Sequence, residues 1–373
     1  MDSQLVADAS ALRGVADRAQ LGLTDRESLV ESLLLAAVAG EHVLVVGPPG
    51  TAKSEAVRRV ANELGGSYFE YLLGRFTEPN EVFGPVDLQR LRNGVVEIAT
   101  TGMLPEAEVA FLDEVFLGST AILNTLLGVL NERVFRRGAT VRHVPLRLCV
   151  GATNALPEDS SLAAFADRFL VHVFVDSISD SSLETMLEAG WTGTERQSSV
   201  PVGIDVLDRL AWARAQCDLG EVRPLVGSAI RRMRSAGIVL SDRRAVRAQG
   251  LVAAASVLDG RMAATEADLW PLPLVAPSAE AQPIAREVLS DLLQSSQNRS
   301  LPYAAEELSA GPLTRARRLV EAADRLLAVS ASAGDGDHRL KVEAVLREID
   351  AGFSTEAMPN DLRLARDSLI ERV

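Results

Sequence analysis

A stretch rich in glycine and proline near residue 50 has the residue types and spacing of a phosphate-binding loop. It reads GPPGTAKS from Gly47 to Ser54, between a short apolar run and a helix-forming sequence. Glycines let backbone N–H groups turn inward around a polyphosphate, and the N-terminus of the next helix directs more N–H groups at the same anion. Lys53 supplies a charge for the β and γ phosphates, and Ser54 offers a hydroxyl to Mg²⁺. The alternative is a turn that binds nothing. We predict a nucleotide site formed by Gly47, Pro48, Pro49, Gly50, Thr51, Ala52, Lys53, Ser54 and Glu55.

One position of this loop departs from the general pattern. Ala52 stands where a glycine usually precedes the lysine. Alanine is tolerated there only if the backbone need not adopt a positive φ. The sequence therefore predicts an ordinary backbone conformation at Ala52.

Two acidic residues end a second apolar run. The sequence VAFLDE is typical of a buried strand that carries Asp113 and Glu114 at its carboxyl end, the end that faces the ligand in a parallel sheet. Asp113 can then hold Mg²⁺, mostly through its water ligands. Glu114 can polarise the attacking water. The alternative is that the two acids cap a helix, but their position downstream of a complete phosphate loop favours a metal and a catalytic role.

Four further polar residues are candidate site residues. Asn154 follows a predicted strand and can contact the γ-phosphate or the attacking water, although it can also be a turn former before Pro157. Arg168 follows a short helix and, taken alone, is better explained as a surface arginine in an ion pair. Arg243 and Arg244 begin a capped helix, from which an arginine can reach back to a nucleotide or remain a solvated basic pair.

Length and composition are those of an ordinary globular protein. The 373 residues are 47% hydrophobic and 24% charged, enough for two or three domains of about 100–200 residues. The net charge of −13 argues against bulk binding of nucleic acid. Cys149 and Cys217 form no disulfide framework, and we expect a reducing, cytoplasmic location. No signal peptide and no membrane span of about 18 apolar residues is expected. The histidines lack metal-ligand spacing, so no transition metal is assigned.

Apolar periodicity predicts an α/β region followed by helices. A helix is expected over 24–40, with Thr24 as its N-cap, Glu27 completing a capping box, and Gly40 at its end. A hairpin with a type I′ turn is expected at Asn93-Gly94. The predicted strands are the run before the phosphate loop and residues 67–73, 109–114, 144–151 and 169–175, and a further helix is expected over 119–133.

The second half of the chain is predicted to be helical throughout. A small bundle is expected through about residue 275, and residues 276–283 have the composition of a linker. Three helices follow it. Packing of these helices on the preceding bundle is favoured over a separate arm that binds a partner.

With these motifs in view, the chain resembles the MoxR branch of the AAA+ ATPases, and within it the RavA group. The resemblance covers roughly residues 24–270 and fades after about residue 276. An alanine before the loop lysine is common in this branch. The resemblance rests on GPPGTAKS, FEYLLGRFTEPNEVFGPV, GMLPEAEVAFLDEVF, AILNTLLGVLNERVFRRG, GATNALPEDSSLAAFADRF and SDRR.

The resemblance implies an architecture of three parts. Residues 1–176 would be an AAA+ α/β core, a parallel sheet flanked by helices, with an N-terminal helix and an inserted hairpin near 86–99 that can face the central channel of a ring. Residues 177–275 would be an all-α lid. Residues 276–373 would be a helical C-terminal extension.

The resemblance also implies roles for single residues. Lys53 and Ser54 would belong to Walker A, Asp113 and Glu114 to Walker B. The remaining site residues would be Asn154 as sensor 1, Arg168 as an arginine finger that enters the neighbouring subunit's site, and Arg243 as sensor 2, with Arg244 as the alternative register.

The implied function is an Mg-ATP-hydrolysing ring, expected to be hexameric, that remodels protein complexes as a chaperone. A von Willebrand factor A-domain protein is the expected partner, and the client is not predicted. Two alternatives are a nucleotide-gated assembly scaffold with little turnover and, disfavoured by the net charge, a DNA-acting motor.

Overall fold

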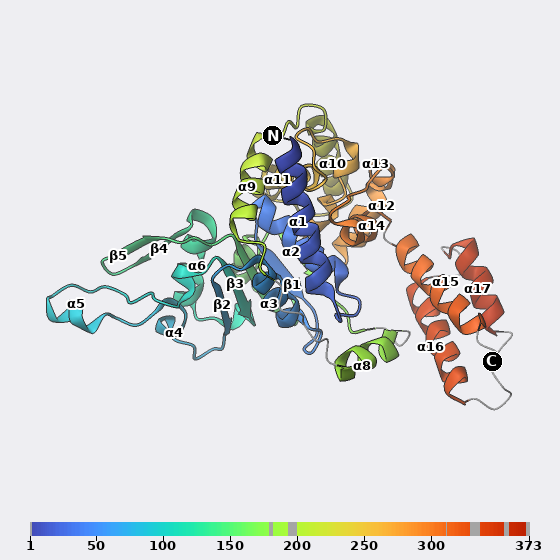
Figure 1. The fold of residues 1–373 in the computed structure, drawn as a ribbon, viewed down its shortest axis with the longest axis horizontal. Helices are drawn as coiled ribbons and strands as arrows, with labels where there is room; N and C mark the ends of the chain where they lie inside the picture. The colour runs from blue at the N-terminus through green and yellow to red at the C-terminus, as the bar shows by residue number, and fades with distance from the viewer. Residues whose placement is uncertain are drawn as a thin grey trace.

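The computed structural model describes residues 2–178, 182–192, 200–310, 312–328, 336–353 and 358–370. Figure 1 shows a central sheet, helices α9, α10 and α11 above it, two projections on the left, and a helical unit at the right. Among the helices of the described ranges, none is long and apolar enough to cross a membrane. The thiols of Cys149 and Cys217 are free.

A five-stranded, fully parallel sheet forms the centre of the first half of the chain. Residues Val43 and Val45 face one hydrophobic core, whereas Leu44 and Val46 face the other, so the sheet is covered on both sides. This explains why its strands are continuous apolar runs. The strands lie in the order β2 (Tyr68–Leu72), β3 (Val109–Asp113), β6 (Leu148–Thr153), β1 (Val43–Val46) and β7 (Val171–Phe174), and all five predicted strands are confirmed.

Helices pack on both faces of this sheet. The second helix begins at Glu27, later than predicted, and its N-cap is Arg26, without a side-chain cap. The predicted capping box is therefore wrong. Gly40 ends the helix in the left-handed conformation at φ 69°, as predicted. The helices of the core are α1 (Asp2–Gln20), α2 (Glu27–Ala39), α3 (Lys53–Leu64), α4 (Pro79–Phe83), α6 (Thr120–Glu132) and α7 (Ser160–Ala166).

Two segments project from the core side by side (Figure 1). In the first, the predicted type I′ turn is wrong, because Asn93 has φ −89° and ends a short helix, α5 (Leu88–Arg92). An isolated antiparallel bridge joins Val86 to Ile98 at its base. The second projection is a hairpin of β4 (Val134–Arg137) and β5 (Thr140–His143), which the sequence analysis did not predict.

Most helices between residues 205 and 310 share one core with α2. The predicted linker is wrong, because Ala276 is fully buried and a new helix begins at Ala281. Residues of that helix and of the two after it belong to the same core as α2. The helices of this region are α9 (Asp205–Gln216), α10 (Arg223–Ser235), α11 (Asp242–Leu258), α12 (Ala281–Val288), α13 (Ser290–Leu293) and α14 (Pro302–Ala310). Helix α8 (Leu183–Thr192) precedes them and contributes no described residue to this core.

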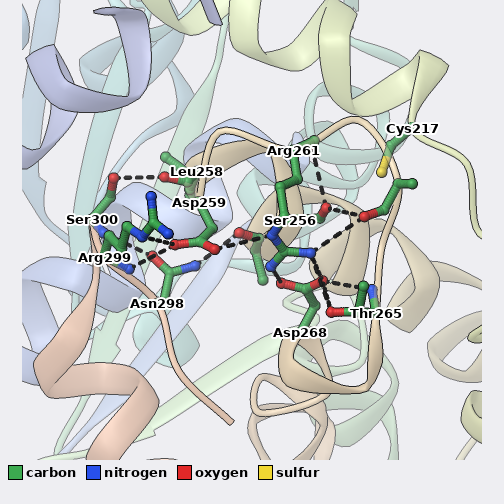
Figure 2. Close-up of polar contacts among 12 residues, drawn as sticks. Cys217, Ser256, Leu258, Asp259, Arg261, Thr265, Asp268, Asn298, Arg299 and Ser300 are labelled. Atoms are coloured by element: carbon green, nitrogen blue, oxygen red, sulfur yellow. Dashed lines mark hydrogen bonds and ion pairs between the residues drawn. The ribbon is translucent and has the colours of Figure 1, made fainter. Parts of the chain in front are cut away.

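A polar network fastens the loops of this helical body (Figure 2). The Asp268 carboxylate is fully buried and accepts two hydrogen bonds from Arg261, at 2.6 and 2.8 Å. Asn298 Nδ2 donates to the carbonyl of Ala255 at 2.8 Å, and the Ser300 hydroxyl donates to the carbonyl of Leu258 at 2.6 Å. Because these contacts satisfy the end of α11 and two loops at once, the network holds the segment before α14 in place.

The three predicted C-terminal helices are present, but they do not pack as predicted. They are α15 (Pro312–Ala328), α16 (Gly336–Gly352) and α17 (Asn360–Ile370). Their buried side chains form a separate core, which includes Leu319, Val345 and Leu362. The expectation that they pack on the preceding bundle is therefore wrong, and Figure 1 shows them beside the main body.

One buried arginine joins the helical body to the sheet. Arg244 is only 2% exposed and donates to the carbonyls of Phe169, Leu170 and Val275 at 2.8 to 3.0 Å. The Ser241 hydroxyl accepts from the Arg244 N–H, which confirms the predicted helix cap. Burial lowers the pKa of Arg244 to about 10.

We predict that Arg244→Ala lowers the free energy of unfolding by at least about 3 kcal/mol, because three buried carbonyl groups lose their donor. Arg243→Ala is the matched control. The Arg243 side chain is exposed and contacts Asn131 at 3.4 Å, so its loss should change stability by less than about 0.5 kcal/mol. Urea denaturation followed by circular dichroism measures both. Equal losses of stability in the two variants would contradict the assignment of Arg244 as the structural arginine.

Candidate nucleotide-binding site

The order of the strands brings the predicted site residues to one edge of the sheet. Strand β6 lies between β1 and β3, so the segments that follow these three strands are neighbours. The N–H of Gly47 donates to the carbonyl of Thr153 at 3.1 Å, which joins the start of the phosphate loop to the residue before Asn154. Asp113 ends β3 at the same edge. The phosphate loop, the acidic pair and Asn154 are therefore brought together as predicted.

The loop requires glycine for two different reasons. A Cβ at Gly47 would lie 2.1 Å from the carbonyl oxygen of Val175, so no side chain fits there. Gly50 has φ +79° and would meet nothing within 4 Å, so its backbone faces open space. In the described part of the chain, no hydrogen bond is donated by the N–H groups of Gly50, Thr51, Ala52, Lys53 and Ser54.

Ala52 contradicts the prediction made from the sequence. Its φ of 59° and ψ of 25° lie in the left-handed region, immediately before helix α3. This conformation costs an L-residue about 1–2 kcal/mol. The loop therefore imposes a positive φ at this position, and the alanine bears the cost.

Lys53 lies folded against its own loop. Its ammonium donates to the carbonyls of Gly47 and Pro48 at 2.6 and 2.9 Å. Burial lowers the pKa of Lys53, while the nearby carboxylates of Asp113 and Glu114 oppose that shift. The positive charge of Lys53 is thus kept at the loop. A phosphate group would replace the two carbonyl oxygens as the partner of the ammonium.

A second buried cation supports the loop and was missed by the sequence analysis. Arg26 is 5% exposed and donates to the carbonyls of Asp25, Thr51 and Asp176 at 2.6 to 2.8 Å. It therefore ties the phosphate loop to the segments that precede α2 and follow β7. The sequence gives no signal for this role, because an arginine between two acids is typical of an exposed turn.

The acidic pair and Asn154 form a second group. The side chain of Asn154 donates to Glu114 Oε1 at 2.5 Å, and Asp113 Oδ1 accepts from the N–H of Glu114 at 3.0 Å. Glu114 has a left-handed backbone, with φ 49° and ψ 47°, which aims its side chain back over the edge of the sheet. Burial and the neighbouring Asp113 raise the pKa of Glu114, whereas Lys53 lowers it. A carboxylate with a raised pKa suits a general base.

The residues present fit a magnesium nucleotide. Five successive N–H groups have no acceptor among the residues that the structure describes, the Gly47 backbone packs where no side chain fits, and Lys53 adds a charge. Ser54 in the first turn of α3 and Asp113 at the end of β3 supply the oxygen ligands that Mg²⁺ prefers. Among the other predicted residues, Pro48 and Pro49 are exposed, and the Glu55 carboxylate pairs with Arg58 and Arg59, so Glu55 offers its backbone rather than its side chain.

The two predicted arginines lie elsewhere in the chain. Arg168 donates to the carbonyl of Ala164 at 3.2 Å, and Arg243 contacts Asn131 at the end of α6. Within the described residues, neither side chain forms a hydrogen bond or ion pair with residues 47–54. Burial is the larger cause of the lowered pKa of Arg168, and the charge of Arg243 contributes to the same shift. This contribution indicates that the two side chains are near each other.

These features are those of the AAA+ class: a parallel sheet with helices on both faces, a phosphate loop after the interior strand β1, and a helical region after the sheet. A solved structure from Cytophaga hutchinsonii, described as a candidate ATPase, has the same fold. Its TM-score is 0.62 at 16% identity, and the match covers 79% of this chain and 97% of that one.

A protein-family model described as the MoxR domain in the MoxR-vWA-beta-propeller ternary systems matches residues 10–210. That is more than half of the chain, which therefore belongs to the MoxR family of AAA+ proteins. Two uncharacterized proteins of Methanocaldococcus jannaschii are each 34% identical over 246 residues, which cover 66% of this chain and 65% and 64% of theirs. The chaperone MoxR1 of Mycobacterium tuberculosis is 27% identical over 157 residues, 41% of each chain.

We predict that Ala52→Gly raises the free energy of unfolding by roughly 0.5–1 kcal/mol. Glycine removes the left-handed penalty but loses more chain freedom on folding, which offsets part of the gain. Ala56→Gly, in the interior of the same helix, is the control and should lower stability by about 1 kcal/mol or more. Thermal and urea denaturation measure both variants. If Ala52→Gly destabilises as much as its control, the left-handed conformation at Ala52 is wrong.

Proposed function

We propose that the chain hydrolyses ATP with Mg²⁺ and uses the energy to remodel protein complexes. The observation that carries the proposal is the pair formed by Glu114 and Asn154 at the edge of the sheet where the phosphate loop and Lys53 also lie. A site that only holds a nucleotide needs the loop and the lysine. It does not need an oriented carboxylate with a raised pKa.

In the proposed mechanism each residue acts on a different part of the reaction. Lys53 leaves the carbonyls of Gly47 and Pro48 and neutralises charge on the β and γ phosphates. The unpaired N–H groups of the loop bind phosphate oxygens. Glu114, oriented by Asn154, accepts the proton of the attacking water. Ser54 and Asp113 would hold Mg²⁺, which would supply positive charge to the phosphates when bound.

Arg168 and Arg243 are proposed to act on the nucleotide of a neighbouring subunit. Their position near each other and away from the loop of their own chain supports this proposal. Arg243 is preferred to Arg244 as sensor 2, because Arg244 is buried among backbone carbonyls. A site completed in this way requires an oligomer. We propose a ring, with six subunits as in the sequence-based prediction.

The biological role is proposed from the family. The matched family model refers to systems that combine MoxR, von Willebrand factor A and β-propeller proteins, which supports a partner of the second kind. The name of MoxR1 supports a chaperone role. The RavA-like grouping, the cytoplasmic location and the division into core, lid and C-terminal extension stay predictions. The packing of α12 to α14 with α2 favours a lid that continues to about residue 310.

We predict that Glu114→Gln lowers ATP turnover at least about 100-fold while nucleotide binding is retained, because the general base is lost and the loop is intact. Release of phosphate and binding of a fluorescent ATP analogue measure the two properties. Lys53→Ala is the contrast, since it should weaken binding itself. If the parent protein and Glu114→Gln are equally inert, the scaffold function replaces the motor.

We also predict that Arg168→Ala lowers turnover by about 10³-fold and that mixing subunits restores part of it. In a mixture of Arg168→Ala and Glu114→Gln chains, some interfaces join an intact Glu114 to an intact Arg168. The mixture should therefore be more active than either variant alone. A mixture of Lys53→Ala and Glu114→Gln is the control and should stay inactive, since no subunit keeps both residues. Failure of the first mixture to recover would place Arg168 in the site of its own chain.

A further inference from the structure

A phenylalanine beside the nucleotide site is almost fully exposed. Phe76 is 97% exposed, although phenylalanine normally buries most of its surface. It lies in an ordered turn in which the N–H of Gly74 donates to the Thr77 hydroxyl at 2.9 Å and the N–H of Thr77 donates back to the carbonyl of Gly74 at 3.1 Å. The turn therefore holds the ring away from its own chain.

Phe76 is also close to the catalytic edge of the sheet. The N–H of Leu73 donates to the carbonyl of Asp113 at 2.9 Å, and Phe76 follows three residues later. Three residues of extended chain span about 10 Å, so the Phe76 backbone lies within about that distance of the Leu73 contact. The Phe76 ring is removed from water at this place only if another protein surface packs against the edge of the nucleotide site.

The same chain also carries an apolar pocket. The pocket lies between α6 and α7, has a volume of about 160 Å³, and is lined by Leu123, Leu127, Leu162 and Phe165 among apolar residues, with Thr120, Asn124 and Arg168 among polar ones. A cavity of about 150 Å³ lined by Leu, Ile and Phe side chains holds benzene. The pocket is thus of the size and chemistry that accept a phenyl ring.

Arg168 lies at the wall of this pocket. A guanidinium at the wall of the pocket also suits the face of an aromatic ring.

We propose that Phe76 of one subunit inserts into the α6–α7 pocket of the next subunit in the ring. The inference rests on the proposed function, in which Arg168 acts on a neighbouring site. Two different and complementary patches on one chain form a head-to-tail contact, which closes into a ring when the rotation allows it. Because Arg168 lines the pocket and Phe76 follows three residues after the Leu73 contact with Asp113, the same contact would bring the arginine toward the rim of its neighbour's site.

A disulfide between separately prepared chains tests the contact directly. One chain carries Phe76→Cys and the other Asn124→Cys, both with Cys217→Ser, since Cys149 is fully buried. A disulfide requires the two Cβ atoms to approach within about 4.5 Å. We expect a cross-linked dimer under mild oxidation. The control replaces Phe76→Cys by Leu72→Cys, at an exposed residue of β2, and should not cross-link.

A second measurement uses variants that keep the pocket unchanged. Phe76→Ala should raise the concentration of half-maximal assembly, measured by sedimentation velocity, at least about tenfold. Phe76→Leu should recover part of that loss, and Leu72→Ala should behave as the parent protein. Because Phe76 contacts little of its own chain, its loss should leave the unfolding transition unchanged.

The outcomes separate this inference from the function on which it rests. Cross-linking specific to Phe76 together with weaker assembly of Phe76→Ala supports the contact. Three results would overturn the contact if the parent protein is assembled and active: no such cross-link, equal cross-linking of the control, or unchanged assembly of Phe76→Ala. Each would leave the proposed function intact. A parent protein without turnover would instead contradict the proposed function, and the cross-link would still report on the contact.

Discussion

Parallel pairing forces the carboxyl ends of all five strands to one edge of the sheet, and the nucleotide site depends on this constraint. Strand β6 separates the strand before the phosphate loop from the strand that ends in Asp113. This spacing separates Lys53 from the acidic pair and leaves room for phosphate groups. Asn154 follows the strand between them, β6, and its side chain donates to Glu114. A different strand order would leave the same residues present but apart.

The site also concentrates backbone conformations that are unfavourable elsewhere. Ala52 and Glu114 are both left-handed without being glycine, and they flank the place where the phosphates would bind. The surrounding structure holds them there, since β1 is fully buried, β3 is buried as far as Leu112, and Arg26 donates to the carbonyl of Thr51. Strain of this kind fixes the direction of the loop N–H groups and of the Glu114 carboxylate before any ligand is bound.

Much of this site follows from local sequence, because a phosphate loop and a strand ending in two acids each carry their own pattern. Asn154 was found in the same way, from its place at a strand end. The left-handed φ of Ala52 was not, since alanine is not a residue type that favours this conformation. Arg26 was missed because its partners are backbone carbonyls distant in sequence.

The errors in the fold have similar causes. Residues 276–283 resemble a linker in composition, but tertiary burial overrides composition at Ala276. Asn93-Gly94 suits a tight turn, yet a helix forms before it, capped by Asp87. The hairpin of β4 and β5 did carry a signal that was overlooked, namely two runs of strand-forming residues around Gly138, which has a positive φ of 59°.

We propose that the catalytic site is completed between subunits. The rate of ATP turnover per subunit across a dilution series with Mg²⁺ present tests this, with assembly followed in parallel by native mass spectrometry. We predict that turnover per subunit falls as the oligomer dissociates. Constant turnover by a dissociated monomer would contradict it, because every residue required for hydrolysis would then lie in one chain.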